Sequence, residues 1–266
     1  MQRRPSWPAK THCFLLSRST SGIPLLLAGC ALAATVLAGC GSSNPPAPSA
    51  SQGIVENRPV PATIPLITTA GTSTSLAAFK GRFVVLAPFL TLCQDECPLV
   101  TGAFIALQRD VDAAGLAHRV VFMEITVDPQ RDTPARLAAY AQRFGADWTL
   151  LTGTPANLNA LWRHFGVSVQ RVAEAQPPKI DWYLGTPLTY DVNHTDGYIL
   201  IDPSGRERFS DSNPPDLHHL DKALTGLLNA GGLRNLSHPQ HPNWTLSEAL
   251  ASLSWLVGKN IPAVGG

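Results

Sequence analysis

The sequence FVVLAPFLTLCQDECP, residues 83–98, decides the fold. Its first part, Phe83–Leu90, is a continuous apolar run of the kind that forms a buried strand. Pro88 has no N–H to donate, so regular strand pairing is expected to end near it. Pro98 suits the first turn of a helix, which we expect to begin at about Glu96 to Pro98 and to run towards Ala114. A strand therefore delivers two cysteines to the start of a helix.

The chain after this stretch alternates between apolar runs and helical patterns. Two helices are expected to begin and end with the same residue types: Thr as the N-cap, Pro in the first turn and Gly at the end. These helices start at Thr133-Pro134 and Thr154-Pro155 and stop at Gly145 and Gly166. Two further strands are expected at Val120–Val127 and Trp148–Leu151.

The second half of the domain is more polar. Val167–Asn193 is predicted to be an insertion or a long hairpin. Tyr198–Ile201 and Glu207–Ser210 flank the turn sequence Asp202-Pro203-Ser204-Gly205, which predicts a hairpin. An amphipathic helix is predicted over Asp216–Ala230, ended by Gly231-Gly232.

This order of elements predicts an α/β domain with a mixed central sheet flanked by helices. A cysteine pair at the start of the first helix makes the architecture thioredoxin-like. We place this domain at residues 59–232 and a C-terminal extension at 233–266. The extension contains a capping box at Thr245–Glu248 before one amphipathic helix, which could lie on the domain or on a membrane.

The first 39 residues have the features of a secretory signal peptide of the lipoprotein type. Four basic residues precede the uncharged apolar stretch Ile23–Gly39. Leu37–Cys40 resembles the bacterial lipobox, in which the cysteine carries the lipid, and a second copy at Leu27–Cys30 would leave a shorter apolar region. A plain transmembrane anchor is the alternative. Residues 40–58, rich in Ser, Pro and Ala, would then be a flexible tether to the outer side of a bacterial membrane.

Composition excludes several classes of protein. The 266 residues include 15% charged residues and carry a formal net charge of +1. A nucleic-acid binder would need a broad basic surface, and a highly charged disordered chain would need far more charge. No internal period is visible, which argues against a repeat architecture.

Cysteine usage points to one reactive pair. Cys93 and Cys97 remain after the signal peptide and the lipidated Cys40 are set aside. The loop that they would close is too short to stabilise the whole fold, so a redox or metal-binding role is favoured over a structural disulfide. A helix N-terminus favours thiolates, which can form a disulfide or bind a soft metal with a third ligand.

Histidine is the natural third ligand, and one of eight stands out. His194 directly precedes the strand Tyr198–Ile201, where thioredoxin-like folds bring a loop towards the dithiol. The remaining histidines are expected to be ordinary surface or structural residues. Two sulfurs with one imidazole would suit Cu(I) and Cu(II), although these ligand types also admit zinc.

Four motifs, in order along the chain, resemble the SCO (SenC) family. They are Cys93-x-x-x-Cys97-Pro98, Val127–Pro134 (VDPQRDTP), Tyr190–Thr195 (YDVNHT) and Leu200–Gly205 (LIDPSG). The resemblance covers about Ile64–Ala230. It implies a membrane-tethered copper-binding protein that helps to assemble the CuA centre of cytochrome c oxidase, with Cys93, Cys97 and His194 as the copper ligands.

The resemblance also implies partners: cytochrome c oxidase subunit II or another cuproprotein, and a thiol reductant. The sequence departs from the family pattern beside the histidine, where Asn193 replaces a common acidic residue, with Asp191 and Asp196 nearby. We therefore consider Asn193 and Asp191, together with Asp128 at the end of a strand, as possible residues around the metal ligands.

Other functions of the cysteine pair lead to different expectations. A thiol-disulfide oxidoreductase would keep a partner's cysteines reduced without metal, although such enzymes typically have two residues between their cysteines rather than three. A peroxidase would place Thr three residues before the cysteine, whereas Thr91 lies two before Cys93. A lipoprotein with an inert disulfide would bind no metal. A classical enzyme is thus not the leading expectation.

Overall fold

A mixed eight-stranded sheet lies at the centre of the computed structural model, which describes residues 44–239 and 242–264. β4, β5 and β6 run parallel to one another, and β9 is antiparallel to β4. From one edge to the other the strands are β1 (Ile54–Pro59), β10 (Arg206–Asp211), β9 (Tyr198–Ile201), β4 (Phe83–Phe89), β5 (Val120–Thr126), β6 (Thr149–Thr152), β2 (Leu66–Thr68) and β3 (Ser73–Thr74).

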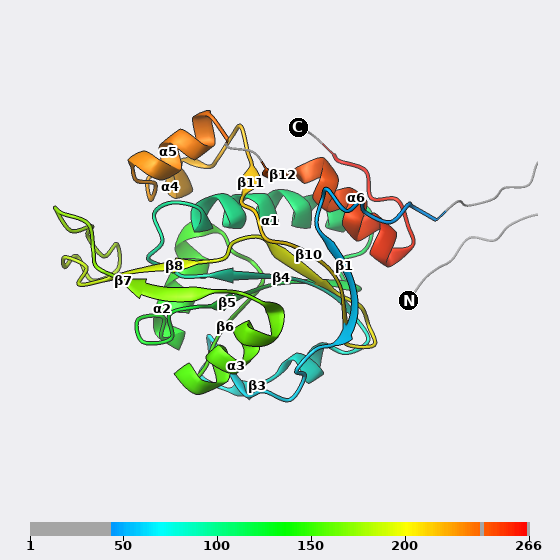
Figure 1. Cartoon of the computed structure of the whole chain (residues 1–266), viewed down its shortest axis with the longest axis horizontal. Coiled ribbons are helices and arrows are strands. Elements are labelled where there is room, and N and C mark those ends of the chain that lie inside the picture. The colour runs from blue at the N-terminus through cyan, green and yellow to red at the C-terminus, as the bar shows by residue number, and fades with distance from the viewer. Residues whose placement is uncertain (1–43, 240–241, 265–266) are drawn as a thin grey trace, which may run out of the picture. The chain divides into compact units, whose positions relative to one another are not determined.

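The apolar run of β4 pairs with β5 along its whole length, but with β9 only as far as Leu86. Pairing therefore ends before Pro88 on the β9 side of the strand, as expected, but continues past Pro88 on the β5 side. Helix α1 (Cys97–Ala113) follows, with Pro98 in its first turn. α1 and α3 (Pro155–Phe165) lie on opposite sides of the sheet (Figure 1). This arrangement confirms the predicted thioredoxin-like α/β fold.

The predicted first and last residues of two helices are confirmed. α2 (Pro134–Phe144) begins after Thr133, whose side chain accepts a hydrogen bond from the Arg136 N–H. α3 begins in the same way after Thr154. Both helices end at a glycine with a φ of 72°, the left-handed conformation that favours this residue.

The polar stretch after α3 forms a long hairpin. β7 (Val169–Val172) pairs antiparallel with β8 (Asp191–His194), and the chain between them extends away from the sheet (Figure 1). β9 and β10 form the second predicted hairpin, closed by a hydrogen bond from the Asp202 N–H to the Arg206 carbonyl. β8 leads into β9 after three residues, so His194, the last residue of β8, lies close to the end of the central sheet at which β9 begins.

The prediction of a single helix over Asp216–Ala230 is wrong. The segment instead contains the short strand β11 (Pro215–Asp216), helix α4 (Lys222–Thr225) and the start of helix α5 (Ala230–Ser237). β11 pairs with β12 (Trp244–Thr245), which holds the backbone extended. Two N-caps, Asp221 and Asn229, start new helices, so Gly231 and Gly232 lie inside α5 rather than ending a helix.

The C-terminal helix lies on the domain. α6 (Leu246–Val257) starts at the predicted capping box and packs against α1. Lys259 Nζ donates to the Ala114 carbonyl oxygen at 2.8 Å, beyond the end of α1. No helix within residues 44–239 and 242–264 is long and apolar enough to cross a membrane.

The domain boundaries differ from those expected. β1 begins at Ile54, inside the range 40–58 assigned to the tether, because its backbone pairs with β10. The segment after residue 232 is also part of the domain, since α6 packs against α1 and Asn235 of α5 donates a hydrogen bond to Asp95. The signal peptide and Cys40 lie outside the described residues.

Candidate metal centre

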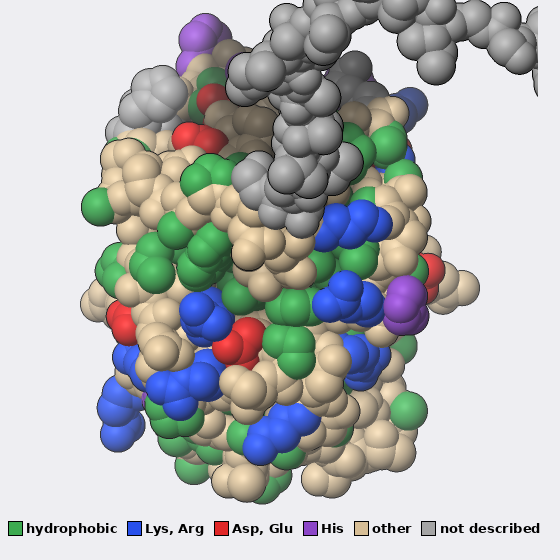
Figure 2. Space-filling model, turned by 90° about the vertical axis from the view of Figure 1, so that its right-hand side faces the viewer, with side chains coloured by type: hydrophobic (Ala, Val, Ile, Leu, Met, Phe, Trp, Pro, Cys, Tyr) green, Lys and Arg blue, Asp and Glu red, His purple; other side chains and the backbone are tan. Residues whose placement is uncertain are grey.

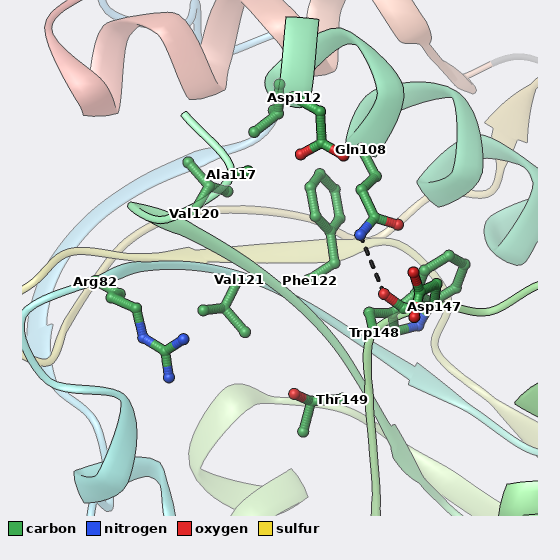
Figure 3. A pocket seen from close by; sticks show the side chains of 11 residues that line it. Arg82, Gln108, Asp112, Ala117, Val120, Val121, Phe122, Asp147, Trp148 and Thr149 are labelled. Carbon is green, nitrogen blue, oxygen red and sulfur yellow. Dashed lines mark hydrogen bonds between the residues drawn. The ribbon is translucent and has the colours of Figure 1, made fainter. Parts of the chain in front are cut away.

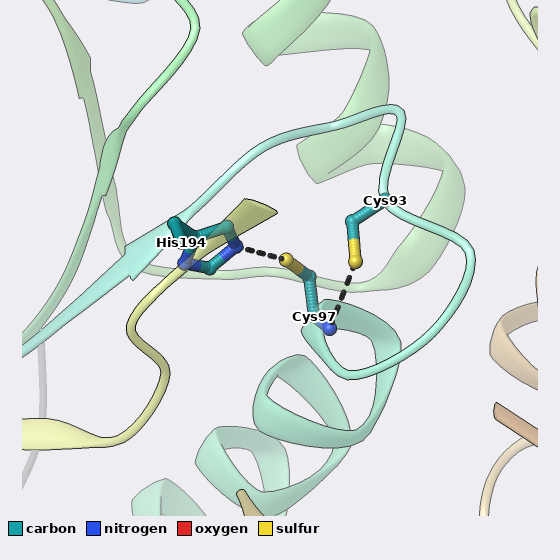
Figure 4. Close-up of side chains that lie close together, drawn as sticks. All are labelled: Cys93, Cys97 and His194. Carbon is teal, nitrogen blue, oxygen red and sulfur yellow. Dashed lines mark hydrogen bonds between the residues drawn. The ribbon is translucent and has the colours of Figure 1, made fainter. Parts of the chain in front are cut away.

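Three side chains that are far apart in the sequence meet at one end of the sheet. The sulfur atoms of Cys93 and Cys97 and a ring nitrogen of His194 all lie within 4.8 Å of one another (Figure 4). Cys93 is in the loop after β4, Cys97 is the first residue of α1, and His194 is the last residue of β8. The structure thus brings the three predicted ligands together.

The two cysteines are free thiols held by the start of the helix. The Cys97 N–H donates to the Cys93 sulfur at 3.4 Å, and the Cys97 sulfur lies 3.4 Å from His194 Nε2. Cys97 is buried, whereas Cys93 is only partly covered. A ligand or reagent from solution would therefore reach Cys93 first.

The orientation of His194 leaves one ring nitrogen for the sulfurs. Nδ1 lies 2.9 Å from the Thr195 carbonyl oxygen, and a carbonyl can only accept, so Nδ1 carries a proton. In the neutral ring Nε2 then bears the lone pair that a metal requires. The side chain is 4% exposed, and Asp196 Oδ1 lies 3.8 Å from Nδ1.

The cysteines differ in their readiness to ionise. The hydrogen bond from the Cys97 thiol, aided by His194, lowers the pKa of Cys93 well below its usual range despite burial. Burial raises the pKa of Cys97, and the neighbouring Cys93 raises it further. Burial lowers the pKa of His194, but the anionic Cys93 sulfur and Asp196 outweigh burial and raise that pKa to about 9. A metal ion would displace the protons of both Cys97 and Nε2.

Carboxylates surround the mouth of the cluster. Asp95, Glu96 and Asp196 line a cavity of about 220 Å³ together with Cys93 and His194. Burial, together with Asp196 and Asp95, raises the pKa of Glu96 to about 8, and burial raises that of Asp196 to about 6. Neighbouring negative groups contribute to the raised pKa of Glu96, so a cation in the cavity would be favoured because it relieves their repulsion.

Helix α5 supports the acidic loop between the cysteines. The Asn235 amide donates to Asp95 Oδ1 at 3.3 Å and also to Glu96. The Asn229 N–H donates to the Gln94 carbonyl oxygen at 2.7 Å. Sequence reasoning missed these contacts because it ended the preceding helix at Gly231-Gly232.

A buried network fixes the strand end that precedes Cys93. The Thr91 and Thr126 hydroxyls each donate to Asp132 at 2.5 Å, one to each carboxylate oxygen. Trp182, from the long hairpin, donates to the Thr91 carbonyl oxygen at 2.6 Å. Asp132 belongs to the VDPQRDTP motif, which therefore has a structural role.

Of the three residues expected around the ligands, Asn193 lines the cavity of the cluster, whereas Asp128 and Asp191 contact other side chains. Asp128 accepts hydrogen bonds from Arg131 and from the Tyr190 hydroxyl. Asp191 forms an ion pair with Lys179 at 3.0 Å. Asn193 is exposed at the rim of the cavity. Asp196 is instead the carboxylate beside the His194 ring.

A second cavity lies at the other end of β4 and β5 (Figure 3). Its volume is about 390 Å³, and its wall includes Arg82, Gln108 and Trp148. The Gln108 amide donates to the Asp147 carbonyl oxygen at 3.1 Å. The wall contains no cysteine or histidine, so this cavity offers no soft ligand.

Comparison with known proteins identifies the family. The family model described as SCO1/SenC matches residues 56–218, which is more than half of the 266-residue chain. A Stutzerimonas stutzeri protein named for copper binding is 28% identical over 154 residues, covering 58% of this chain and 70% of that protein. The mitochondrial SCO2 homologue of Bos taurus is 31% identical over 129 residues, covering 48% of this chain and 45% of that protein.

The chain thus matches less than half the length of this mitochondrial relative. Among solved structures, copper-bound ScoI of Bradyrhizobium japonicum is 25% identical, with a TM-score of 0.46, covering 65% of this chain and 97% of that one. The family match spans the cysteine pair, the VDPQRDTP stretch and His194. By this match the chain belongs to the SCO1/SenC family.

Proposed function

We propose that this protein is a copper metallochaperone that binds the metal through Cys93, Cys97 and His194. The convergence of two sulfurs and one imidazole within 4.8 Å carries the proposal. Two thiolates suit Cu(I), and the added imidazole makes Cu(II) acceptable. Membership of the SCO1/SenC family and the copper-binding name of the bacterial relative support copper over zinc.

The proposed client rests on the family resemblance. Resemblance to proteins that assemble the CuA centre makes cytochrome c oxidase subunit II, or another cuproprotein, the proposed recipient. The sequence supports delivery at a membrane surface, because Leu37–Cys40 resembles a lipobox and only residues 41–53 separate Cys40 from β1. We place the folded domain outside the cytoplasm, attached through the lipid on Cys40.

The dithiol makes copper binding dependent on redox state. Oxidation of Cys93 and Cys97 to a disulfide removes two electrons and both thiol protons, and it leaves no thiolate for the metal. A thiol reductant must return the electrons and protons before copper binds again. Such a reductant is therefore a proposed partner.

A second function is favoured by the difference between the two cysteines. Cys93 is partly exposed with a lowered pKa, whereas Cys97 is buried with a raised pKa. This is the arrangement of an attacking thiolate and a resolving thiol. The protein could therefore act as a thiol-disulfide oxidoreductase towards a partner.

Metal analysis separates the two functions. Reduced full-length protein should bind one copper ion, and His194→Ala should weaken Cu(II) binding by at least about tenfold because the imidazole is lost. His218→Ala is the matched control, since its side chain is 84% exposed and lies outside the cluster. Copper binding that is unchanged by His194→Ala would refute the proposed site.

The same variants test the oxidoreductase function. Reduction of a disulfide peptide by the metal-free protein depends on Cys93, and it should be retained in His194→Ala if this function is the main one. Loss of peptide reduction only in Cys93→Ser, together with no copper binding in the wild type, would favour the oxidoreductase and reject the chaperone.

A further inference from the structure

Charge is separated between the two ends of the domain. Asp95, Glu96 and Asp196 lie at the metal end. Basic side chains gather on the face of the molecule that forms the right-hand side of Figure 1 and that Figure 2 shows from the front. α1 runs from the metal end to this basic end over 17 residues, or about 25 Å. The formal net charge of +1 conceals this asymmetry.

We define the basic face by Arg58, Lys80, Arg82, Arg119 and Arg206. Arg82 and Arg119 flank the first residues of β4 and β5, since the Phe83 N–H donates to the Arg119 carbonyl. The Lys80 side chain lies against the β9–β10 turn, with Cε 3.4 Å from where a Cβ on Gly205 would stand. Arg206 follows that turn and pairs with Pro59 of β1.

Three cations of the basic face carry unneutralised charge. Lys80, Arg82 and Arg119 are exposed, and none has a carboxylate partner among the residues that the structure describes. Arg82 and Arg119 stack on phenylalanine rings, at 5.3 and 5.4 Å from the ring centroids, which holds the guanidinium groups at the surface. Arg58 is neutralised by Glu207.

The edge strand β1, which carries Arg58, also exposes apolar side chains. Ile54 and Val55 on the edge strand β1 are 60% and 49% exposed. Strand β1 lies on the side of the molecule that Figure 2 faces. Basic residues and exposed apolar side chains on one side of a protein are the combination that binds the interface of an anionic bilayer.

We infer that the basic face docks on an anionic lipid surface and so turns the metal centre away from the membrane. The inference rests on the N-terminal attachment in the proposed function. Residues 41–53, between Cys40 and β1, can reach no further than about 45 Å even when fully extended, which keeps β1 close to the attachment point. Each exposed Lys or Arg near an anionic leaflet adds about a fivefold gain in binding.

Hydrogen–deuterium exchange on vesicles tests this orientation. The full chain is attached to vesicles of phosphatidylcholine alone, or with roughly one third phosphatidylglycerol. Amides of residues 79–82 and 118–120 should exchange about tenfold more slowly on the anionic vesicles, whereas residues 93–97 should not change. Salt at about 1 M, where the Debye length is about 3 Å, should abolish the difference.

Two matched triple variants provide the controls. Lys80→Gln, Arg82→Gln and Arg119→Gln together should abolish the protection, whereas Arg143→Gln, Lys222→Gln and Arg234→Gln should retain it. Equal exchange on both vesicles, or protection that survives in the first variant, would overturn the inference. Copper binding is measured in parallel, so that failure of the proposed copper site can be distinguished from failure of membrane docking. Failure to attach to either vesicle would reject the N-terminal anchor instead.

Discussion

A fully buried carboxyl group, Glu124, lies in the middle of β5 beneath helix α1. Its oxygens accept hydrogen bonds from the Thr101 hydroxyl and the Trp148 indole, both at 3.0 Å. Tyr140 extends the network through Thr101 at 2.9 Å. Burial nevertheless raises the pKa of Glu124 to about 7, because these neutral donors replace water only in part.

This carboxyl group should make stability dependent on pH. The native pKa of about 7 lies above the ordinary value of 4.5, so the stabilising contribution is complete below pH 4.5 and is lost as pH rises through 7. A difference of this size corresponds to about 3 kcal/mol. Between pH 5 and 8, wild-type protein should therefore lose about 2 to 3 kcal/mol more unfolding free energy than Glu124→Gln.

Urea denaturation of the metal-free protein at both pH values measures this difference. Glu96, Asp132 and Asp196 also have raised pKa values, so both proteins should lose stability, but only the wild type carries the Glu124 contribution. The exposed Asp112→Asn serves as the control and should follow the wild type. Parallel curves for wild type and Glu124→Gln would contradict the assignment.

Individual site residues were predictable where local sequence decides their position. Cys93 and Cys97 are only four residues apart in the loop that leads into α1, so their proximity follows from the spacing. The position of Asp196 does not, because it depends on the turn at Gly197, which has a φ of 97°. A Cβ on Gly197 would lie 1.9 Å from the Asp211 carbonyl oxygen, a contact made by a strand that is distant in the sequence.

At the level of elements, α5 shows how packing can override a local signal. Two consecutive glycines usually end a helix, yet here they lie within the first turn of α5. A Cβ on Gly232 would stand 2.9 Å from the Asp95 carbonyl oxygen and 3.0 Å from that of Gln94. The glycines therefore let α5 approach the backbone of the cysteine loop.

Gly232→Ala should push α5 away from this loop. The methyl group would meet backbone oxygen atoms that cannot move without shifting Cys93 and Cys97, at a cost of about 1 to 3 kcal/mol. We expect lower stability and weaker copper binding, measured by denaturation and by competition with a Cu(I) chelator. Gly226→Ala is the control, since its nearest contacts are at 3.4 Å. Wild-type copper affinity in Gly232→Ala would show that α5 does not position the loop.

For the whole molecule, the order of the strands and helices could be predicted from the sequence, but which distant elements pair or pack together could not. The strands and helices from Phe83 to Gly166 carry their own hydrophobic runs and caps, and each forms close to its expected place. The pairing of β1 with β10 joins segments about 150 residues apart, and no local pattern encodes it. Because such long-range contacts leave no local pattern, β1 was assigned to the tether and the segment after residue 232 was assigned to a separate extension.

The C-terminal helix provides the sharpest test of this larger domain. Leu253 in α6 is 2% exposed where α6 packs on α1, so Leu253→Ala should lower the free energy of unfolding by about 2 to 5 kcal/mol. Leu233→Ala removes the same atoms from a side chain that is 45% exposed, and should change stability by less than about 0.5 kcal/mol. Both values come from urea denaturation in the absence of lipid. An α6 that served only to lie on a membrane would make the two variants equally stable, because neither leucine would then contribute to the folded domain in solution.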